Sequence, residues 1–313
     1  MPHDDTTLHY STNFYMKMKK VFILIAMLAI VSCGTSRKVR KDAASDSIIR
    51  VGTYNLWKST IGKGDYAWEV RKHRLAKSVA ELDFDVFGVQ ELDYPIQDEF
   101  PGLLARHGAS EYVWYTFSPY SQDGTGDKAQ AILFRKDRFE LVEGHSFWLS
   151  PTPDIMSHGW DEQKYLRGAC CVILKDIRTG KRIFVMNSHF PLGKEAKCRA
   201  ADVVISMEKK YNPEGLPSFL IGDLNNRPGT PGSQMLRTHW TDSFLFLPDD
   251  KKEGSKGTFN GHDVGRDMEK SQRIDYVYFR NSAVPLKYHC SNMKYDGFWP
   301  SDHCAVYVDM KIN

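Results

Sequence analysis

Short apolar runs bounded by Gly, Pro, Asp and Asn recur from residue 48 to the C-terminus, and many carry branched or aromatic side chains. Such runs are typical of β-strands, because branched and aromatic side chains pack well on a pleated sheet and the bounding residues favour turns. We therefore predict strands at 48–57, 84–92, 112–117, 129–135, 139–149, 168–177, 182–190, 218–225, 273–280, 284–293 and 304–312.

Two segments instead place apolar residues at helical spacing, and we predict helices at 67–82 and 194–211. So many strands do not fit comfortably in one ordinary sheet. The pattern therefore favours an α/β fold in which two sheets pack face to face with helices outside. No internal repeat, low-complexity segment or linker interrupts the chain after residue 50.

The N-terminal region has a different pattern. A basic segment at 16–20 precedes an apolar run at 21–31, and Ser32, Cys33 and Gly34 follow. This order is that of a secretory signal, and the run is too short to span a membrane. The alternative is a buried helix of the fold, which the coincidence of basic flank, run length and small residues disfavours. The segment 30–33 also resembles a bacterial lipobox, in which the cysteine carries the lipid.

This interpretation divides the chain into three parts. Residues 1–33 would be a leader and lipoprotein signal peptide, with 1–15 preceding the true start, and Cys33 would be lipidated. Residues 34–47 would be a flexible tether, and 48–313 the folded domain. We expect an exported lipoprotein held at a membrane of the bacterial cell envelope, and a monomer. The periplasmic and outer faces both stay open.

Composition narrows the function classes. The chain has 313 residues, 42% of them hydrophobic, and a formal net charge of +3. That balance suits one large core and gives no strong nucleic-acid footprint, because DNA binding depends on many cationic contacts to phosphates. A basic patch could still be built from Arg135, Lys136, Arg138, Lys175 and Lys181.

The cysteines point to neither zinc nor a disulfide framework. Five remain when Cys33 is set aside, and none lies in a CxxC spacing. Packing accounts for Cys170 and Cys171, which lie in an apolar run. A bridge between Cys290 and Cys304 stays open.

Several predicted strands end in polar or ionisable residues, and these carry the chemistry. They deliver Asn55, Glu91, Asn187, His189, Asp223, Asn225, Asp275, Asp302 and His303. Asp223 and Asn225 lie two positions apart and so project to the same side, whereas alternation separates Asp302 from His303 unless the chain is in a loop there. Carboxylates gathered at one edge repel one another without a cation. Oxygen ligands without a Cys/His cluster suggest Mg²⁺, Mn²⁺ or Ca²⁺.

At this point the motifs resemble those of the endonuclease/exonuclease/phosphatase superfamily. In chain order they are "YNLW", "VQELD", "AILFRKDRFEL…FWLS", "NSHF", "GDLNNRPGT", "RIDYVYF" and "SDHCAVYVDM". The resemblance runs from about residue 48 to the C-terminus and is greatest to a poorly characterised bacterial lipoprotein branch. It implies the deoxyribonuclease-I-like fold, a four-layer α/β/β/α sandwich of two mixed sheets with outer helices.

The resemblance also implies roles for these residues. Glu91 would be the main Mg²⁺ ligand, helped by Asn55 and Asp302, with Mn²⁺ as the alternative metal. Asp223 and Asn225 would position or activate the attacking water and hold the phosphate. His303, oriented by Asp275, would act as acid/base or as a charged hydrogen-bond donor, with His189 as the second donor.

Other positions are less determined. Many relatives have an Asp where this chain has Pro191, two residues after His189, so no contact is inferred there. Arg167 and Arg199 are candidate partners either for a substrate phosphate or for structural carboxylates. Four aromatic residues, Trp57, Trp160, Phe298 and Trp299, are candidates for stacking on a sugar or a base.

The function that this sequence favours is Mg²⁺-dependent hydrolysis of a phosphate ester of a small molecule, lipid or sugar at the cell envelope. An exported nuclease of the same fold is the alternative, disfavoured by the near-neutral charge. A catalytically silent binding module is the third reading. It would be expected to have replaced Glu91, Asp223, Asn225 or His303, and all four are present.

Overall fold

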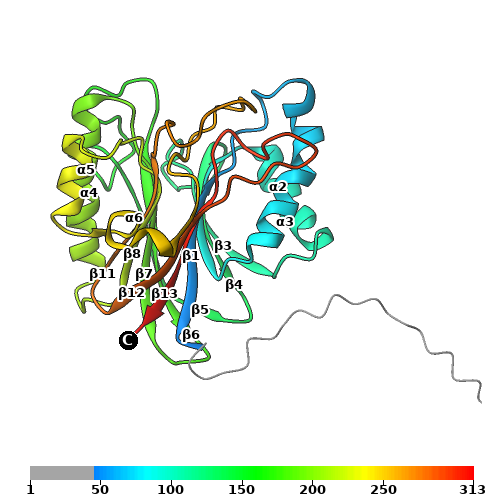
Figure 1. The fold of residues 1–313 in the computed structure, drawn as a ribbon. Helices are drawn as coiled ribbons and strands as arrows, with labels where there is room; N and C mark the ends of the chain where they lie inside the picture. The colour runs from blue at the N-terminus through cyan, green and yellow to red at the C-terminus, as the bar shows by residue number, and fades with distance from the viewer. Residues whose placement is uncertain (1–45) are drawn as a thin grey trace, which may run out of the picture. The chain divides into compact units, whose positions relative to one another are not determined.

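Two mixed β-sheets pack face to face in the computed structural model, which describes residues 46–313 (Figure 1). In order across the first sheet, the strands are β10 (Lys252–Gly254), β12 (Ala283–Cys290), β13 (Val306–Ile312), β1 (Ile48–Asn55), β2 (Val86–Leu92), β4 (Ala129–Arg135) and β3 (Tyr112–Phe117). In the second sheet they are β5 (Phe139–Trp148), β6 (Gly168–Asp176), β7 (Arg182–His189), β8 (Ser218–Asp223), β11 (Asp275–Arg280) and β9 (Thr241–Asp242).

Helices cover the outer face of each sheet (Figure 1). α2 (Trp68–Leu82) and α3 (Tyr94–Arg106) pack on the first sheet, and α4 (Lys194–Tyr211) and α5 (Pro231–Arg237) pack on the second. The shorter helical elements are α6 (Ser243–Phe246), η1 (Gly64–Tyr66) and η2 (Asp249–Lys251). The predicted four-layer α/β/β/α sandwich is thus confirmed. No helix among residues 46–313 combines the length and apolar character needed to cross a bilayer.

Alternation along the strands divides the buried residues between three cores. On β8, Phe219 and Ile221 face the other sheet, whereas Leu220 faces the helices. β7 repeats the pattern, with Val185 facing inward and Met186 outward. The central strands are therefore apolar on both faces, as expected for strands that are buried on both sides.

One polar crossing ties the two sheets together within this core. The amide nitrogen of Asn187 donates to the carbonyls of Val89 (3.0 Å) and Ala131 (2.9 Å), and its oxygen accepts from Gln90 (2.7 Å). Gly88 leaves the space for this side chain, since a Cβ there would lie 2.3 Å from the Asn187 oxygen. Asn187, which the sequence placed among the strand-end polar residues, therefore acts as a structural clamp.

The sequence-based elements differ from the observed ones in a few places. Helix α3 was not predicted, and it contains two prolines, Pro95 and Pro101. Pro95 occupies the first turn, where no intrahelical N–H is required, and Pro101 is accommodated inside the helix. The last two strands are shorter than predicted, ending at Cys290 and starting at Val306. Elements α5, α6, β9 and β10 are too short for a periodic signal.

The proposed basic patch is not present as a patch. Arg135 pairs with Asp137 and Asp83, and Lys136 pairs with Glu111. Arg138 is buried against Asp85 and Asp176, Lys175 pairs with Glu140, and Lys181 donates to the carbonyl of Ile312. These residues lie where β4 and β6 end and β5 and β7 begin, at the opposite end of the sheets from Asp223.

Candidate active site

The inward-facing rows of the central strands end in polar residues at one edge of the sandwich. The row of Phe219 and Ile221 on β8 continues to Asp223, and the row of β7 continues to His189. β7 and β8 are parallel, with His189 opposite Asp223, so their last residues meet at the same edge. Asn55 on β1 and Asp275 on β11 arrive by the same alternation. The apolar inner row thus anchors each strand while its last inward residue reaches the cleft.

Glu91 reaches this cleft by a departure from alternation. Regular pleating would place it on the helix-covered face with Phe87 and Val89. Instead, the pairing of β2 with β4 shifts between Val89 and Leu92, and Glu91 adopts φ 62°. A bulge of this kind turns a side chain to the other face, and left-handed backbone in a Glu is costly. The strained backbone of Glu91 therefore directs its carboxylate toward Asn55 and Asp223.

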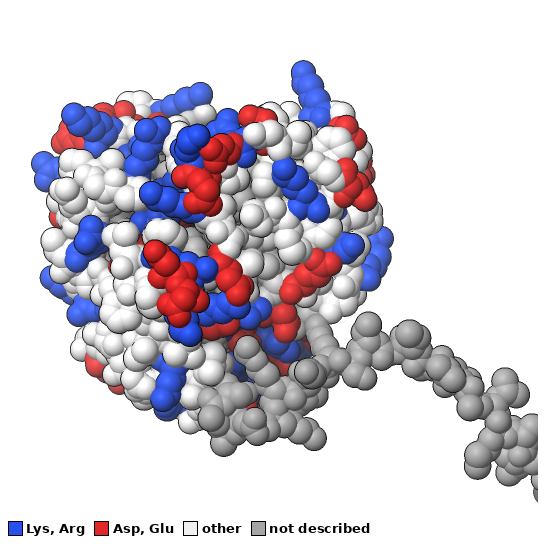
Figure 2. Space-filling model, viewed as in Figure 1, with Lys and Arg blue, Asp and Glu red and all other residues white. Residues whose placement is uncertain are grey.

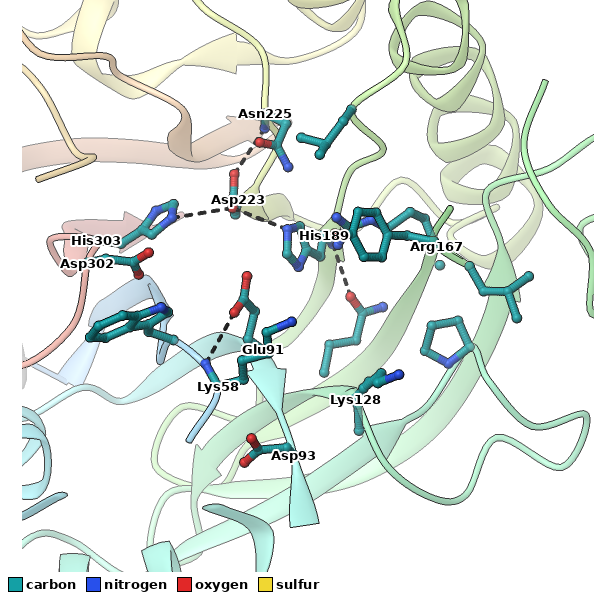
Figure 3. A pocket seen from close by; sticks show the side chains of 18 of the residues that line it. Lys58, Glu91, Asp93, Lys128, Arg167, His189, Asp223, Asn225, Asp302 and His303 are labelled. Carbon is teal, nitrogen blue, oxygen red and sulfur yellow. Dashed lines mark hydrogen bonds and ion pairs between the residues drawn. The ribbon is translucent and has the colours of Figure 1, made fainter. Parts of the chain in front are cut away.

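Asp223 is the hub of the site (Figure 3). Its Oδ2 atom accepts from the Asn55 amide at 3.1 Å and lies 3.3 Å from Nε2 of His189 and 3.7 Å from Nε2 of His303. Its Oδ1 atom accepts the backbone N–H of Asn225 at 3.1 Å. This carboxylate is 2% exposed, so its charge depends on these donors.

Asp275 and His303 form a buried pair. Nδ1 of His303 lies 2.9 Å from Oδ2 and 3.1 Å from Oδ1 of Asp275, and Thr258 donates to the same carboxylate at 2.6 Å. The contact fixes the imidazole with Nε2 toward Asp223. The structure therefore brings together two residues that are 28 positions apart in the sequence.

Asp302 and His303 both line the cavity, which alternation along a strand would forbid. Here the chain is still in a loop, since β13 begins only at Val306. Ser301 holds this loop by donating to the carbonyl of Asn55 at 2.6 Å. The loop alternative raised for these two residues is the one observed.

The histidines differ in charge. Burial alone would lower the pKa of His303, but Asp275, Asp223 and Asp302 outweigh it and raise that pKa well above its ordinary value. Burial and the nearby Arg167 lower the pKa of His189, despite the opposing effect of Asp223. His303 is therefore the cationic histidine and His189 the neutral one.

The carboxyl groups also differ. Burial opposes ionisation of Asp223, yet His303 and His189 hold its pKa well below the usual range. Burial acts against Glu91 too, but His189 and a 3.2 Å hydrogen bond from the backbone N–H of Lys58 keep its pKa low. For Asp302, burial, reinforced by Glu91 and opposed by His303, raises the pKa to about 7. The cleft thus gathers three carboxyl groups, Glu91, Asp223 and Asp302, beside the two histidines.

Such a group of carboxyl oxygens fits a hard divalent cation. Glu91 and Asp302 line the same cavity, and a cation there would restore the ionised form of Asp302. Oxygen donors of this kind suit Mg²⁺ or Mn²⁺. The side-chain N–H of Asn55 donates to Glu91 at 3.4 Å, and its side-chain oxygen accepts the backbone N–H of Trp57. In this structure Asn55 therefore orients the carboxylate of Glu91.

A second group with the composition of a metal site comprises Asp223, Asp275 and His303, whose ligand atoms lie within 4.8 Å of one another. Within this group, Asp275 and His303 are already hydrogen-bonded to each other. The Thr258 hydroxyl also donates a hydrogen bond to Asp275. These contacts leave fewer free ligand atoms for a cation in this group.

The cavity over these groups has a volume of about 420 Å³. Its aromatic walls are Trp57, Tyr120, Tyr165 and Phe259. Of the aromatic residues proposed for stacking, only Trp57 is among them. Trp299 is instead buried and donates to the carbonyl of Asp263, and Phe298 packs on the edge of Tyr66. Trp160 does not line the cavity either.

The two candidate arginines separate cleanly. Arg167 lines the cavity, and its buried Nε has no hydrogen-bond partner. Arg199 lies on the exposed face of α4, pairs with Glu195 at 3.7 Å and does not line the cavity. Arg167 lies near the cavity because it immediately precedes the first residue of β6. That strand pairs with β7, whose last residue is His189.

Sequence reasoning missed further cavity residues. Gln130 accepts the backbone N–H of His189 at 3.0 Å, and its own amide nitrogen is buried without a partner. Lys128 lies two residues earlier, and Figure 3 shows it beside the cavity with Arg167 and Asp93. Tyr120 and Tyr165 come from loops that carry no periodic signal. Of these residues, only Gln130 had a signal in the sequence, because it is a polar residue within an apolar predicted strand.

Comparison with known proteins accounts for this arrangement. A sequence profile described as "Endonuclease/Exonuclease/phosphatase family" matches residues 52–303. No curated protein matched the chain. Among solved structures, a mannosyl-6-phosphatase of Bacteroides thetaiotaomicron is 28% identical, with a TM-score of 0.72, and the match covers 84% of this chain and 99% of that one.

Two further structures are similar. An endonuclease/exonuclease/phosphatase family protein of Bacteroides thetaiotaomicron is 27% identical, with a TM-score of 0.74, and the match covers 85% of this chain and 98% of that one. The human Nocturnin catalytic domain, at 17% identity, a TM-score of 0.65 and coverage of 85% and 95%, shows the shared fold alone.

Proposed function

Because the chain belongs to the endonuclease/exonuclease/phosphatase family, whose members are metal-dependent phosphoester hydrolases, we propose that it is a Mg²⁺-dependent phosphatase of a small phosphorylated molecule, in the first place a sugar phosphate. Mn²⁺ is the alternative metal. The carboxylates and histidines described above are the groups that such a reaction requires.

Two unsatisfied donors support a ligand that is rich in oxygen acceptors. The Nε2 atom of Gln130 and the Nε atom of Arg167 are buried, lack partners and belong to residues that line the cavity. A buried donor without an acceptor is costly, and the cost is removed when a ligand supplies oxygens. Phosphate and sugar hydroxyl oxygens are such acceptors.

Cavity size and surface charge favour a small substrate over a polynucleotide. A volume of about 420 Å³ is that of a pocket for a small organic molecule. Basic and acidic side chains are interspersed over the face seen in Figure 2, without an extended basic field. The similar Bacteroides mannosyl-6-phosphatase supports the same substrate class.

The residues suggest the following reaction. Glu91 and Asp302 would hold the Mg²⁺, with Asn55 orienting Glu91, and the ion when bound supplies positive charge at the phosphoryl group. Asp223, ionised at neutral pH, takes a proton from water as the water oxygen bonds to phosphorus. Asn225, held at φ 48° with its amide donating to the Phe190 carbonyl, fixes the turn that presents Asp223.

The remaining steps fall to the histidines. His189 and the charged His303 donate hydrogen bonds to the phosphoryl oxygens. The bond from phosphorus to the ester oxygen breaks, and that oxygen takes a proton from His303 to leave as an alcohol. Asp223, 3.7 Å from Nε2 of His303, then returns its proton to the imidazole.

The same proposal places the enzyme at the cell envelope. The signal-like segment and Cys33 lie outside the described residues, and their order in the sequence is what supports an exported lipoprotein.

A phosphate-release screen of the full-length chain tests the proposed activity. Mannose 6-phosphate, glucose 6-phosphate, glycerol phosphate and a 5′-phosphorylated oligonucleotide would be compared in Mg²⁺, in Mn²⁺ and in EDTA. We expect EDTA-sensitive release from the sugar phosphates. Cleavage of the oligonucleotide chain without release from any sugar phosphate would identify a nuclease instead. Absence of hydrolysis throughout would indicate a binding module.

A further inference from the structure

We infer that a groove beside the catalytic cavity is a second phosphate subsite, so that the preferred substrate carries two phosphate groups, one cleaved and one held. We call it the annex groove and define it by Lys194, Lys197, Asn226, Arg227 and Thr230. This inference rests on the proposed phosphatase function and narrows its substrate class.

The annex groove adjoins the catalytic cavity. Leu192, Asn225, Gln272 and Ile274 line both spaces. The annex volume is about 440 Å³, similar to that of the cavity. A small molecule whose one phosphate lies at Asp223 can therefore place a second anionic group beyond Asn225.

The groove is lined by three cations and no carboxylate. Lys194 and Lys197 come from the first turn of α4, and Arg227 comes from the loop between β8 and α5. Within residues 46–313, no ion pair involves any of the three. Most basic residues at the far end of the sheets, by contrast, are paired with carboxylates.

Nearby carboxylates are engaged elsewhere. Asp161 accepts the backbone N–H groups of Glu195 and Ala196 at the start of α4, and Glu195 pairs with Arg199. Burial lowers the pKa of Lys197 and Arg227 adds to that change, whereas Asp223 and Asp161 oppose it. Lys197 thus lies within electrostatic reach of both the catalytic carboxylate and the second annex cation.

Asn226 supplies an independent observation. It is 2% exposed and lines the groove, and its Nδ2 atom is buried without a hydrogen-bond partner. Its oxygen lies 3.3 Å from the Thr230 hydroxyl, which also donates to the carbonyl of Arg227 at 2.8 Å. Gly232 packs against this amide, since a Cβ there would lie 3.0 Å from Nδ2. A preorganised donor among unpaired cations is suited to a phosphate oxygen.

A matched set of substrates tests the annex groove. Butane-1,4-diol bisphosphate and hexane-1,6-diol bisphosphate would be compared with the corresponding hydroxyalkyl monophosphates on the full-length enzyme with Mg²⁺. We expect kcat/KM to be at least about tenfold higher for a bisphosphate of suitable length, because the second phosphate adds contacts to Lys197, Arg227 and Asn226. Equal kcat/KM values at every length would overturn the inference.

Variants assign the preference to the groove. In Lys197→Met/Arg227→Met, the ratio of bisphosphate to monophosphate kcat/KM should fall toward one. Lys175→Met, which removes an exposed lysine paired with Glu140 at the far end of the sheets, should keep the wild-type ratio. Thermal unfolding of each variant verifies folding. A preference that survives in the folded double variant would contradict the assignment.

A binding measurement separates this inference from the proposed activity. Inorganic phosphate would be titrated calorimetrically into wild-type enzyme and the double variant in EDTA, where no hydrolysis occurs. Binding weakened about tenfold or more in the double variant supports the annex groove even if no ester is hydrolysed. Equal binding contradicts it. The same titration would be made with a dinucleotide and with both bisphosphates. If the dinucleotide bound more tightly than either bisphosphate, and the double variant lost this binding, the inference of a small bisphosphate substrate would be rejected.

Discussion

Asp223 and its neighbours show how single residues create the charge pattern of the site. His303 and His189 stabilise the ionised form of Asp223, whereas Asp302 beside Glu91 has its pKa raised to about 7. Neighbouring carboxyl groups thus reach opposite protonation preferences within one cleft. This difference in pKa suits Asp223 to act as a base, whereas Asp302 needs a nearby cation to become fully ionised.

Replacing Glu91 by Gln should abolish most of the activity and leave the fold intact. The substitution keeps the shape of the side chain and removes the charge proposed to hold Mg²⁺. The activation barrier should rise by several kcal/mol, on the order of a hundredfold or more in kcat/KM. Steady-state rates across a Mg²⁺ titration, together with thermal unfolding, check this. Glu140→Gln, an exposed site on β5, is the control. Wild-type rates at limiting Mg²⁺ would exclude Glu91 as the ligand.

Asp275 and His303 should behave as one unit in a double-mutant cycle. Asp275→Asn, His303→Ala and the double variant should lose similar amounts of kcat/KM, because either change removes the oriented, charged imidazole. A coupling of about 1 kcal/mol or more is expected. If the losses were additive in folded variants, Asp275 would serve only as a structural residue at the start of β11.

At the scale of elements, the geometry of the site depends on contacts between strands and helices more than on the stability of any single element. Asn187 clamps β7 to β2 and β4, and the strain at Glu91 lies one residue beyond Gln90, which bonds to this clamp. Helix α4 carries two annex cations and starts directly after the loop that follows His189. Changes at these junctions should therefore affect both stability and site geometry.

Gly88→Ala tests the clamp between the sheets. The new Cβ would lie 2.3 Å from Oδ1 of Asn187, so the amide must move and lose hydrogen bonds. We expect a loss of about 1–3 kcal/mol in the free energy of unfolding, measured by urea denaturation. Gly102→Ala in α3, where a Cβ meets no atom within 4 Å, should be neutral or slightly stabilising. Equal effects at both positions would contradict the role assigned to the clamp.

Asp161→Asn tests the start of α4 and has a defined pH dependence. Hydrogen bonding from the backbone N–H of Ala196 lowers the pKa of Asp161. A lowered folded-state pKa stabilises the protein above the ordinary Asp pKa, and the gain disappears as pH falls through the lowered value. The melting temperature of Asp161→Asn should therefore lie below wild type at pH 7, and this gap should narrow at pH 3. Asp202→Asn, on the exposed face of α4, should show no gap; a constant gap for Asp161→Asn would refute the effect.

On the scale of the whole molecule, the sandwich presents its site at one edge, while the tether prediction concerns residues outside the described range. The first strand begins at Ile48, and the C-terminal strand ends at Ile312 beside it in the first sheet. The edge that carries Asp223 is formed by the other ends of β1, β7 and β8. Ile48 therefore lies at the end of the sandwich opposite the candidate site.

Cys33→Ser should release the protein from the membrane fraction if Cys33 carries the lipid. Cell fractionation followed by immunoblotting measures the distribution. Cys198→Ser, on the half-exposed side of α4, should stay with the membranes as wild type does. Retention of both variants would show that Cys33 is not the anchor.

The sequence by itself determined the two packed sheets, the helices α2 and α4 and the membership of the family, because these follow from periodicity and from motifs that are local in the chain. It also named the residues at the strand ends. Tertiary structure alone decided which of them meet: Arg167 enters the cavity and Arg199 does not, and Asp302 joins His303 through a loop. The bulge that turns Glu91 and the loops that bring Tyr120, Tyr165 and the annex cations together depend on contacts between distant segments. Alternation and spacing do not encode such contacts, because they describe each strand or helix separately.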